Sequence, residues 1–202
     1  MPAPDAVLEF WFGPDRDDLP SVDTRHDRWF RPDAALDGEI RRRFTDLVWR
    51  ARTGALDSWT LRPEGRLALV IVLDQFTRQI YRGTARAFEN DTRAVGYTLD
   101  GLHSGADRAL NLFERAFLYL PLEHSELLED QERSVACFER LVSDTPLLWQ
   151  ARARSFLAHA REHREIVRRF GRFPHRNVIL GRASSAEERA YLDAGGRRFG
   201  QR

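Results

Sequence analysis

The stretch from Glu64 to Tyr81 constrains the fold more than any other part of the chain. It contains seven consecutive apolar residues, Leu67 to Leu73, shortly after the helix-opening Pro63-Glu64-Gly65. A helix that is apolar on every side must be covered on every side, because none of its faces can be left in water. The sequence therefore predicts a central buried helix over about 64–81, surrounded by other elements.

The same helical period runs through most of the remaining chain, and no convincing series of strands or hairpin turns interrupts it. A second helix is expected from after Pro32 to the break at Gly54, and Pro121 is interpreted as a break between two others. A serine with a glutamate three positions on, within Ser184 to Glu188, predicts the capped start of a last short helix ending at Leu192. The other helices are expected over about 5–12, 87–102, 106–119, 123–141 and 146–169. Short turns between helices predict an all-α fold of stacked antiparallel helical hairpins.

The chain of 202 residues predicts a single domain, 1–202, with an ordered core over about 5–193 and a loose tail over 194–202. Its 32 basic and 31 acidic residues leave a net charge of +1, so a general polyanion binder is not expected and nucleic acid is an unlikely partner. The N-terminus does not resemble a secretory signal, and no apolar run reaches the ~20 residues that span a bilayer. These features predict a cytoplasmic protein without a membrane partner.

Two aspects of the composition exclude classes of chemistry. Every basic residue is arginine, so Schiff-base lysines and phosphate-loop lysines are absent and any anion site must use guanidinium groups. The single Cys137 excludes an internal disulfide and a multi-cysteine zinc site, and its apolar helical surroundings predict a buried, unreactive thiol.

The first polar stretch that could carry function lies at the end of the central helix. Asp74, Arg78 and Arg82 are four residues apart and share one side, as i,i+4 ion pairs require. Asp74 follows the apolar run and needs a partner if it is buried. The ladder is therefore either an ion-paired staple between helices or an arginine surface for an anionic ligand, oriented by Asp74.

The second stretch, Pro121 to Glu126, places Glu123, His124 and Glu126 at the expected start of a helix. The N-terminal helix dipole favours carboxylates there and is a sufficient structural reason for them. The functional alternative is a carboxylate–histidine acid/base pair or a set of metal ligands. No metal site is predicted from such an undefined spacing.

The third stretch, Phe170 to Arg182, has Gly171 and Gly181 for unusual backbone angles and Pro174 to stiffen the turn. Its polar residues either bond nearby carbonyls and acids or form a pocket for a carboxylate or phosphate, with His175 as proton donor. These residues are Arg172, His175, Arg176, Asn177 and Arg182.

A further pattern, His159 to His163, matches the H-x-x-E-H motif of inverted zinc peptidases. Only 39 residues follow His163, too few to supply that site's third ligand well downstream, so the match is interpreted as chance.

Together these motifs resemble the bacterial "domain of unknown function 924" family over about Val7 to Gln201. The resemblance is carried by Phe10-Trp-Phe-Gly13, Asp74-Gln-Phe-Thr-Arg78 with Arg82 and Ala87-Phe-Glu-Asn-Asp91, Pro121-Leu-Glu-His-Ser-Glu126, and Phe170-Gly-Arg-Phe-Pro-His-Arg-Asn177 with Leu180-Gly-Arg182. Gln79 departs from the pattern, which has Asn after the arginine; His163 belongs to the pattern and His159 does not. The resemblance implies a fold similar to tetratricopeptide-repeat superhelices, although the residues themselves show no fixed-period repeat, and it implies no established activity.

Two functions are therefore expected as alternatives. In the first, the three stretches meet around one groove that binds an anionic small molecule or peptide through Asp74, Arg78, Arg82, Glu126, Arg172, Arg176, Asn177 and Arg182. In the second, the protein is a hydrolase or lyase in which His124 or His175, with Glu123 nearby, acts as acid or base. The cofactor and the oligomeric state are not indicated by the sequence. The single-groove prediction requires the stretches to lie within about one Debye length, ~10 Å, of one another.

Overall fold

A computed structural model describes residues 3–199, and every regular element within that range is helical. The main helices are α1 (Pro4–Phe12), α2 (Leu19–Asp23), α3 (His26–Phe30), α4 (Ala34–Arg52), α5 (Pro63–Ile71), α6 (Thr77–Ile80), α7 (Asp91–Ser104), α8 (Leu112–His124), α9 (Leu128–Asp144), α10 (Gln150–Phe170) and α11 (Ala186–Asp193). The all-α prediction is confirmed. None of these helices is both long and apolar enough to cross a bilayer.

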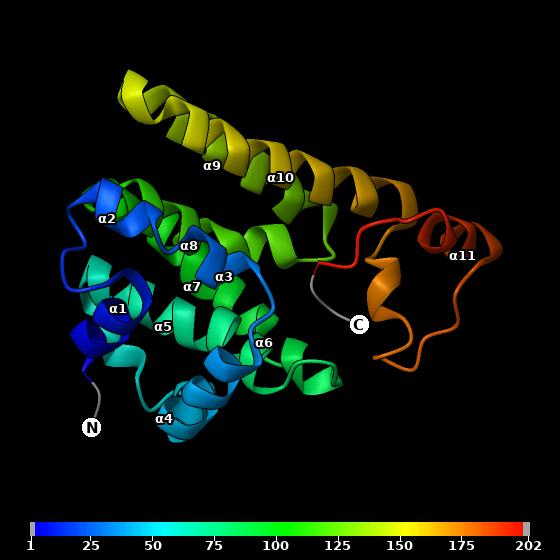
Figure 1. Cartoon of the computed structure of the whole chain (residues 1–202), viewed down its shortest axis with the longest axis horizontal. Coiled ribbons are helices and arrows are strands. Elements are labelled where there is room, and N and C mark those ends of the chain that lie inside the picture. Colours follow the sequence, from blue (N-terminus) through cyan, green and yellow to red (C-terminus); the bar gives the residue numbers. More distant parts are fainter. Residues whose placement is uncertain (1–2, 200–202) are drawn as a thin grey trace.

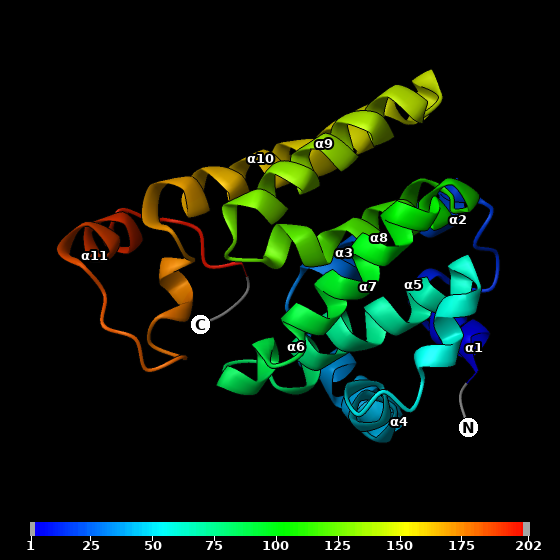
Figure 2. The same ribbon diagram turned by 180° about the vertical axis from the view of Figure 1, so that it is seen from behind.

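The helices are arranged in layers around the apolar stretch that the sequence singled out. Leu67 to Leu73 are at most 1% exposed and lie in α5 and the turn that follows it. Helices α1, α4, α7 and α8 pack around this segment, while α9 and α10 run side by side above α8 (Figures 1 and 2). Burying the central helix on all sides is the arrangement that its apolar circumference requires.

An aromatic cluster joins the N-terminal helices to this core. Trp11, Trp29 and Phe117 are buried, with ring centroids 5.5 Å apart for Trp11–Phe117 and 4.9 Å for Trp29–Phe117. The indole nitrogen of Trp29 also donates a hydrogen bond to the carbonyl of Trp11 at 3.0 Å. These contacts hold α3, a short helix that the sequence did not predict, against α1 and α8.

The central helix is not regular throughout. Between α5 and α6, residues Val72–Phe76 form a π-helical turn, in which the chain takes five residues instead of four to return to the same side. The hydroxyl of Thr77 donates to the carbonyl of Val72, five residues back, at 3.3 Å. Asp74 lies in this turn, and π-helical turns occur frequently at functional sites.

The interpretation of Pro121 as a break between helices was wrong. Asn111 caps the start of α8 in a reciprocal pair with Glu114, and the helix continues through Pro121 to His124. Glu123 and His124 therefore lie at the C-terminal end of α8, and Glu126 lies in the link to α9. The helix-dipole reason for the two carboxylates does not apply, because a helix C-terminus favours positive charge.

The chain beyond α10 folds back over the end of the helical layers (Figure 1). Gly171 and Gly181 adopt the positive φ values of 68° and 65° that were expected of them, and Ser185 and Glu188 form the expected capping pair of α11. Residues 195–199, expected to be part of a loose tail, make defined contacts. The Phe199 ring stacks on His163 with centroids 3.9 Å apart, and Arg197 donates to Glu162 at 2.7 Å. Residues 200–202 of that tail lie outside the described range.

Candidate functional site

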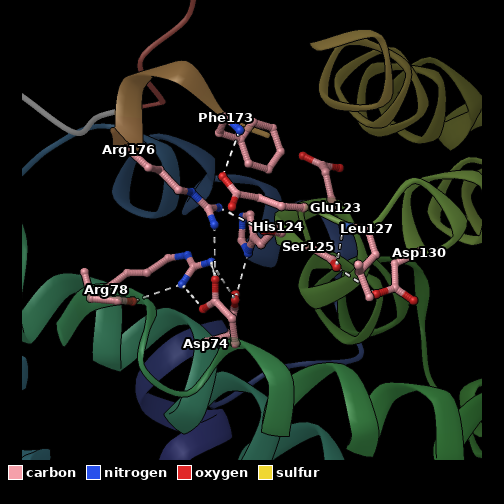
Figure 3. A network of polar contacts seen from close by, with 12 residues as sticks. Asp74, Arg78, Glu123, His124, Ser125, Leu127, Asp130, Phe173 and Arg176 are labelled. Atoms are coloured by element: carbon pink, nitrogen blue, oxygen red, sulfur yellow. Dashed lines mark hydrogen bonds and ion pairs between the residues drawn. The ribbon is translucent and has the colours of Figure 1, made fainter. Parts of the chain in front are cut away.

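Asp74, Arg78, Asp91, His124 and Arg176 form a connected group of buried polar contacts, called here the ionic cluster (Figure 3). They come from the π-helical turn, α6, the start of α7, the end of α8 and the turn after Phe173. The three polar stretches of the sequence are thus joined by direct contacts, well within the distance that a single site requires.

The carboxylate of Asp74 anchors one side of the ionic cluster. It is 1% exposed and accepts hydrogen bonds from His124 Nδ1 at 2.7 Å and from the Gln75 amide at 2.6 Å. Its i,i+4 partner Arg78 lies 3.5 Å away. Burial alone would raise the pKa of Asp74, but the charge of Arg78 and the contact with His124 hold it well below its ordinary value. Asp74 is therefore ionised at neutral pH.

His124 faces Asp74 as a neutral imidazole. Burial lowers the pKa of His124 below 6.5, although Asp74 opposes that shift. Because the ionised Asp74 only accepts, Nδ1 carries the proton and Nε2 keeps its lone pair. Within residues 3–199, Nε2 makes no hydrogen bond with the protein.

Arg78 and Arg176 share one carboxylate, that of Asp91. Arg78 binds Asp91 through two hydrogen bonds of 2.7 and 3.0 Å, whereas Arg176 reaches it only at 3.4 Å. Arg176 also donates to the carbonyl of His124 at 2.9 Å, and its guanidinium lies between the rings of Phe88 and Phe173, 4.5 and 4.6 Å from their centroids. Burial, followed by the nearby charge of Arg78, lowers the pKa of Arg176 to about 10. The positive charge of Arg176 is thus less fully compensated than that of Arg78.

A large cavity of about 820 Å³ opens beside the ionic cluster. Its polar lining residues include Gln75, Arg78, Arg82, Glu123 and His124, called here the polar wall, and its aromatic lining residues include Trp29, Phe30 and Phe156. Arg82 pairs with Asp37 of α4 at 2.6 Å and so extends the wall without joining the ionic cluster. The predicted ladder of Asp74, Arg78 and Arg82 therefore holds for its first two members.

Glu123 lies in the same wall and is 4% exposed. Burial and the negative charge of Asp74 raise the pKa of Glu123 to about 8, so the carboxyl group is mostly protonated at neutral pH. Its Oε1 lies 3.0 Å from Nδ1 of His163, which also contacts the carbonyl of His159 at 2.8 Å. His163 is buried and its pKa lies well below 6.5 because of that burial, so this pair is neutral.

Some residues of the third polar stretch lie at the site, and others hold the turn that carries them. Arg176 belongs to the ionic cluster, and the buried His175 is its neighbour in the chain. Arg182 binds Glu126 through two hydrogen bonds of 2.7 and 2.9 Å, and Glu126 also accepts from the backbone N–H of Phe173 at 2.8 Å, so this pair fixes the turn that carries His175 and Arg176.

Arg172 and Asn177 do not line either of the two cavities described for this site. Arg172 binds Glu188 of α11 through contacts of 2.6 and 2.9 Å, and the fully buried Asn177 bonds Ser184 and Arg182. Both residues hold the segment after α10 in place, which is the structural alternative raised for this stretch.

Some residues of the site were not singled out from the sequence. Asp91 and Phe88 were only part of a family motif, and Phe199 fell in the expected loose tail. Asp91 lies thirteen residues after Arg78, beyond a glycine turn, and this spacing allows the chain to bring the two side chains together. No local sequence pattern shows that the Asp91 carboxylate contacts the Arg78 guanidinium. The described residues contain no group of three or more histidine, cysteine or acidic side chains arranged to hold a metal ion.

The fold and the site define an all-helical protein with a buried ionic cluster at the wall of a cavity. Residues 7–196 match the family model described as "Bacterial protein of unknown function (DUF924)", and the chain belongs to that family. A solved structure of the protein of unknown function ATU0120 from Agrobacterium tumefaciens is similar, with 37% sequence identity and a TM-score of 0.80, covering 95% of this chain and 97% of that one. No curated protein sequence matches the chain.

Proposed function

We propose that the protein binds a small anionic molecule in the large cavity beside the ionic cluster. The observation that carries this proposal is the sharing of Asp91 by Arg78 and Arg176, which leaves Arg176 as a buried cation with incomplete compensation. A buried charge is costly unless it is paired, and a bound anion supplies the missing partner. The guanidinium is fixed between two aromatic rings, so little order has to be gained on binding.

A small molecule fits the geometry better than a peptide. The volume of about 820 Å³ lies within the range of about 300–1,000 Å³ that is usual for ligand pockets, and the lining contains apolar as well as polar residues. Two further expectations remain predictions, and the proposal does not depend on them. One is the likeness to a tetratricopeptide-repeat superhelix, in which stacked hairpins form a concave binding face. The other is a location in the cytoplasm.

Binding is tested by isothermal titration calorimetry with 3-phenylpropanoate and inorganic phosphate as anionic probes. We expect saturable binding of an anion to the wild-type protein that weakens at least tenfold in Arg176→Met. The matched control is Arg168→Met, because Arg168 is an exposed arginine of α10 outside both cavities, and this variant should bind as the wild type does. Absence of any saturable anion binding, or equal loss in both variants, would refute the proposal.

A second candidate function is acid–base catalysis, in a hydrolase or lyase. The observation in its favour is the contact of 2.7 Å between Asp74 and His124, which orients a neutral imidazole with its Nε2 lone pair free to accept a proton. The protonated carboxyl of Glu123 lies in the same cavity wall and can donate one. His175 is a weaker choice of base, because burial and then the charge of Arg176 lower its pKa to about 3.

The hydrolase form is tested with 4-nitrophenyl esters of acetate and of longer acids. We expect a hydrolysis rate above that of buffer that falls at least tenfold in His124→Gln. The control is His103→Gln, because His103 is an exposed histidine of α7 outside both cavities. A rate that is the same in both variants would eliminate His124 as the base for this reaction.

A further inference from the structure

A second, small pocket of about 60 Å³ adjoins the large cavity. Four residues line both spaces, namely Arg78, His124, His163 and Phe199. The rest of the small pocket is formed by Phe88, Phe173, His175 and Arg176. The two spaces therefore have a common boundary.

The lining of the small pocket has an unusual charge composition. Two guanidinium groups and three imidazoles line it together with three phenylalanines, and no carboxylate is found among its described lining residues. The carboxylates that compensate Arg78 and Arg176 contact these arginines outside that lining. The pocket thus presents nitrogen groups and aromatic rings, and it presents no acidic group that would repel an anion.

Two nitrogen atoms in this wall have no partner. Nδ1 of His175 and Nε of Arg176 make no hydrogen bond within the described structure. Both atoms are buried, and both residues are less than 10% exposed. A buried N–H group without an acceptor costs free energy, and such groups are rare in folded proteins. Both atoms belong to residues that line the small pocket, where an acceptor could reach them.

The large cavity also has apolar lining residues, together with charged ones such as Asp27 and Arg31. The apolar residues are Trp29, Phe30, Pro32, Leu120 and Phe156. Apolar surface of this kind is stabilised by burial against an aliphatic or aromatic group, and it adds nothing to the binding of a small inorganic anion. The two spaces together suit a molecule with one charged end and an apolar body.

We propose that the two spaces form one bipartite binding site for an amphipathic carboxylate, a molecule with one carboxylate group on an aromatic or aliphatic body. The carboxylate occupies the small pocket, where Arg176 and His175 donate hydrogen bonds to it, and the apolar body lies in the large cavity against Trp29 and Phe156. This inference rests on the proposed binding function and specifies its ligand class and orientation.

A carboxylate fits the small pocket better than a phosphate group does. The two arginines of the ionic cluster face two carboxylates, those of Asp74 and Asp91, so the cluster is close to neutral and a carboxylate adds less excess negative charge than a doubly charged phosphate does. A planar carboxylate also matches the planar fork of donors on arginine.

The test is calorimetric titration of the wild-type protein with four probes: 3-phenylpropanoate, its neutral amide, acetate and inorganic phosphate. We expect 3-phenylpropanoate to bind at least tenfold more tightly than each of the other three. In a series of straight-chain carboxylates from butanoate to octanoate, affinity should rise by about threefold to fourfold per methylene group until the cavity is filled. These measurements need no variant, so a folding defect cannot obscure them.

The outcomes separate this inference from the proposal on which it rests. Equal, Arg176-dependent binding of acetate, phosphate and 3-phenylpropanoate would keep the anion-binding function and overturn the bipartite site. Equal binding of 3-phenylpropanoate and its amide would overturn the role of the charged end. Failure of every anion to bind would overturn both. A His175→Leu variant, with its fold checked by circular dichroism, should weaken 3-phenylpropanoate and leave the weak binding of the amide unchanged; an unchanged affinity for the carboxylate would remove His175 from the site.

Discussion

Replacement of Arg78 and of Arg176 by methionine should have different effects on stability, because the charges of these two arginines are compensated unequally. Arg78→Met removes a guanidinium that binds Asp91 through two hydrogen bonds and lies 3.5 Å from the buried Asp74. Two carboxylates then lose their main cation inside the protein. Breaking a buried pair on one side costs about 3–5 kcal/mol, so Arg78→Met should lower the free energy of unfolding by about that amount.

Arg176→Met removes a charge that the fold holds at a cost. The lowering of the pKa of Arg176 from its ordinary value of 12.5 to about 10 corresponds to about 3 kcal/mol against the charged form in the folded state. Because the pKa of this base is depressed by folding, that cost is present at neutral pH and disappears only as the pH rises above about 10. Methionine is flexible and apolar and can fill the space between Phe88 and Phe173.

The substitution of Arg176 also removes a favourable contact, which offsets the free energy gained by removing the buried charge. It removes the hydrogen bond to the carbonyl of His124, worth about 1.5–3 kcal/mol when one partner is charged. The attraction of Asp91 is already included in the pKa of about 10. The two contributions nearly cancel. We therefore expect Arg176→Met to change the free energy of unfolding by no more than about 1 kcal/mol in the absence of ligand.

The assay is reversible urea unfolding at pH 7, followed by tryptophan fluorescence, with thermal unfolding in parallel. For a chain of this length, each 1 kcal/mol shifts the midpoint temperature by about 2–4 °C, so Arg78→Met should lose at least about 6 °C and Arg176→Met less than about 4 °C. If Arg176→Met is destabilised as much as Arg78→Met, Arg176 is a structural staple. The observation that carries the binding proposal would then be lost.

Three further predictions concern other parts of the molecule. Burial raises the pKa of Glu123 to about 8, so the folded protein keeps a proton that the unfolded chain releases above about pH 4.5. The free energy of unfolding of Glu123→Gln should therefore rise relative to that of the wild type between pH 4.5 and 8, by up to about 4 kcal/mol. A difference in urea midpoint between the two proteins that does not vary with pH would contradict this. A methyl group at Gly196 would lie 2.6 Å from the carbonyl oxygen of Tyr191, so Gly196→Ala should displace residues 195–199 and speed their hydrogen exchange. The control is Gly38→Ala in an exposed part of α4, where a methyl group meets no atom within 4 Å. This control should stabilise the protein by about 0.5–1 kcal/mol. Burial raises the pKa of Cys137 to about 11, so its thiol should react with Ellman's reagent at pH 8 only after unfolding; rapid reaction of the folded protein would show that the thiol is accessible.

The sequence predicts the helical class and most helix positions because their signals are local. The run of apolar residues from 67 to 73, the glycine after Phe170 and the capping pair of Ser185 each act within a few residues. Pro121 misled the prediction because tertiary packing holds the last turn of α8 in helical form despite the ring, and the two flanking residues are buried there. The short helix α3 has no strong pattern of its own and is held by the contacts of Trp29.

The site was partly predictable for the same reason. A surplus of polar residues beside apolar ones indicated that Asp74, His124 and Arg176 need partners, and the structure places the three in one cluster. Which partner each arginine takes could not be predicted, because the choice depends on contacts between residues far apart in the chain. Arg82 pairs with Asp37, 45 residues away, and Arg172 pairs with Glu188 of the last helix.

The π-helical turn at Val72–Phe76 fits five residues into about the rotation that four residues of an α-helix complete. The helix after the turn therefore keeps its orientation, and Arg78 stays on the side that faces Asp91. The extra residue is taken up within the turn itself, where Asp74 lies, so the irregular backbone is confined to the segment whose carboxylate contacts His124.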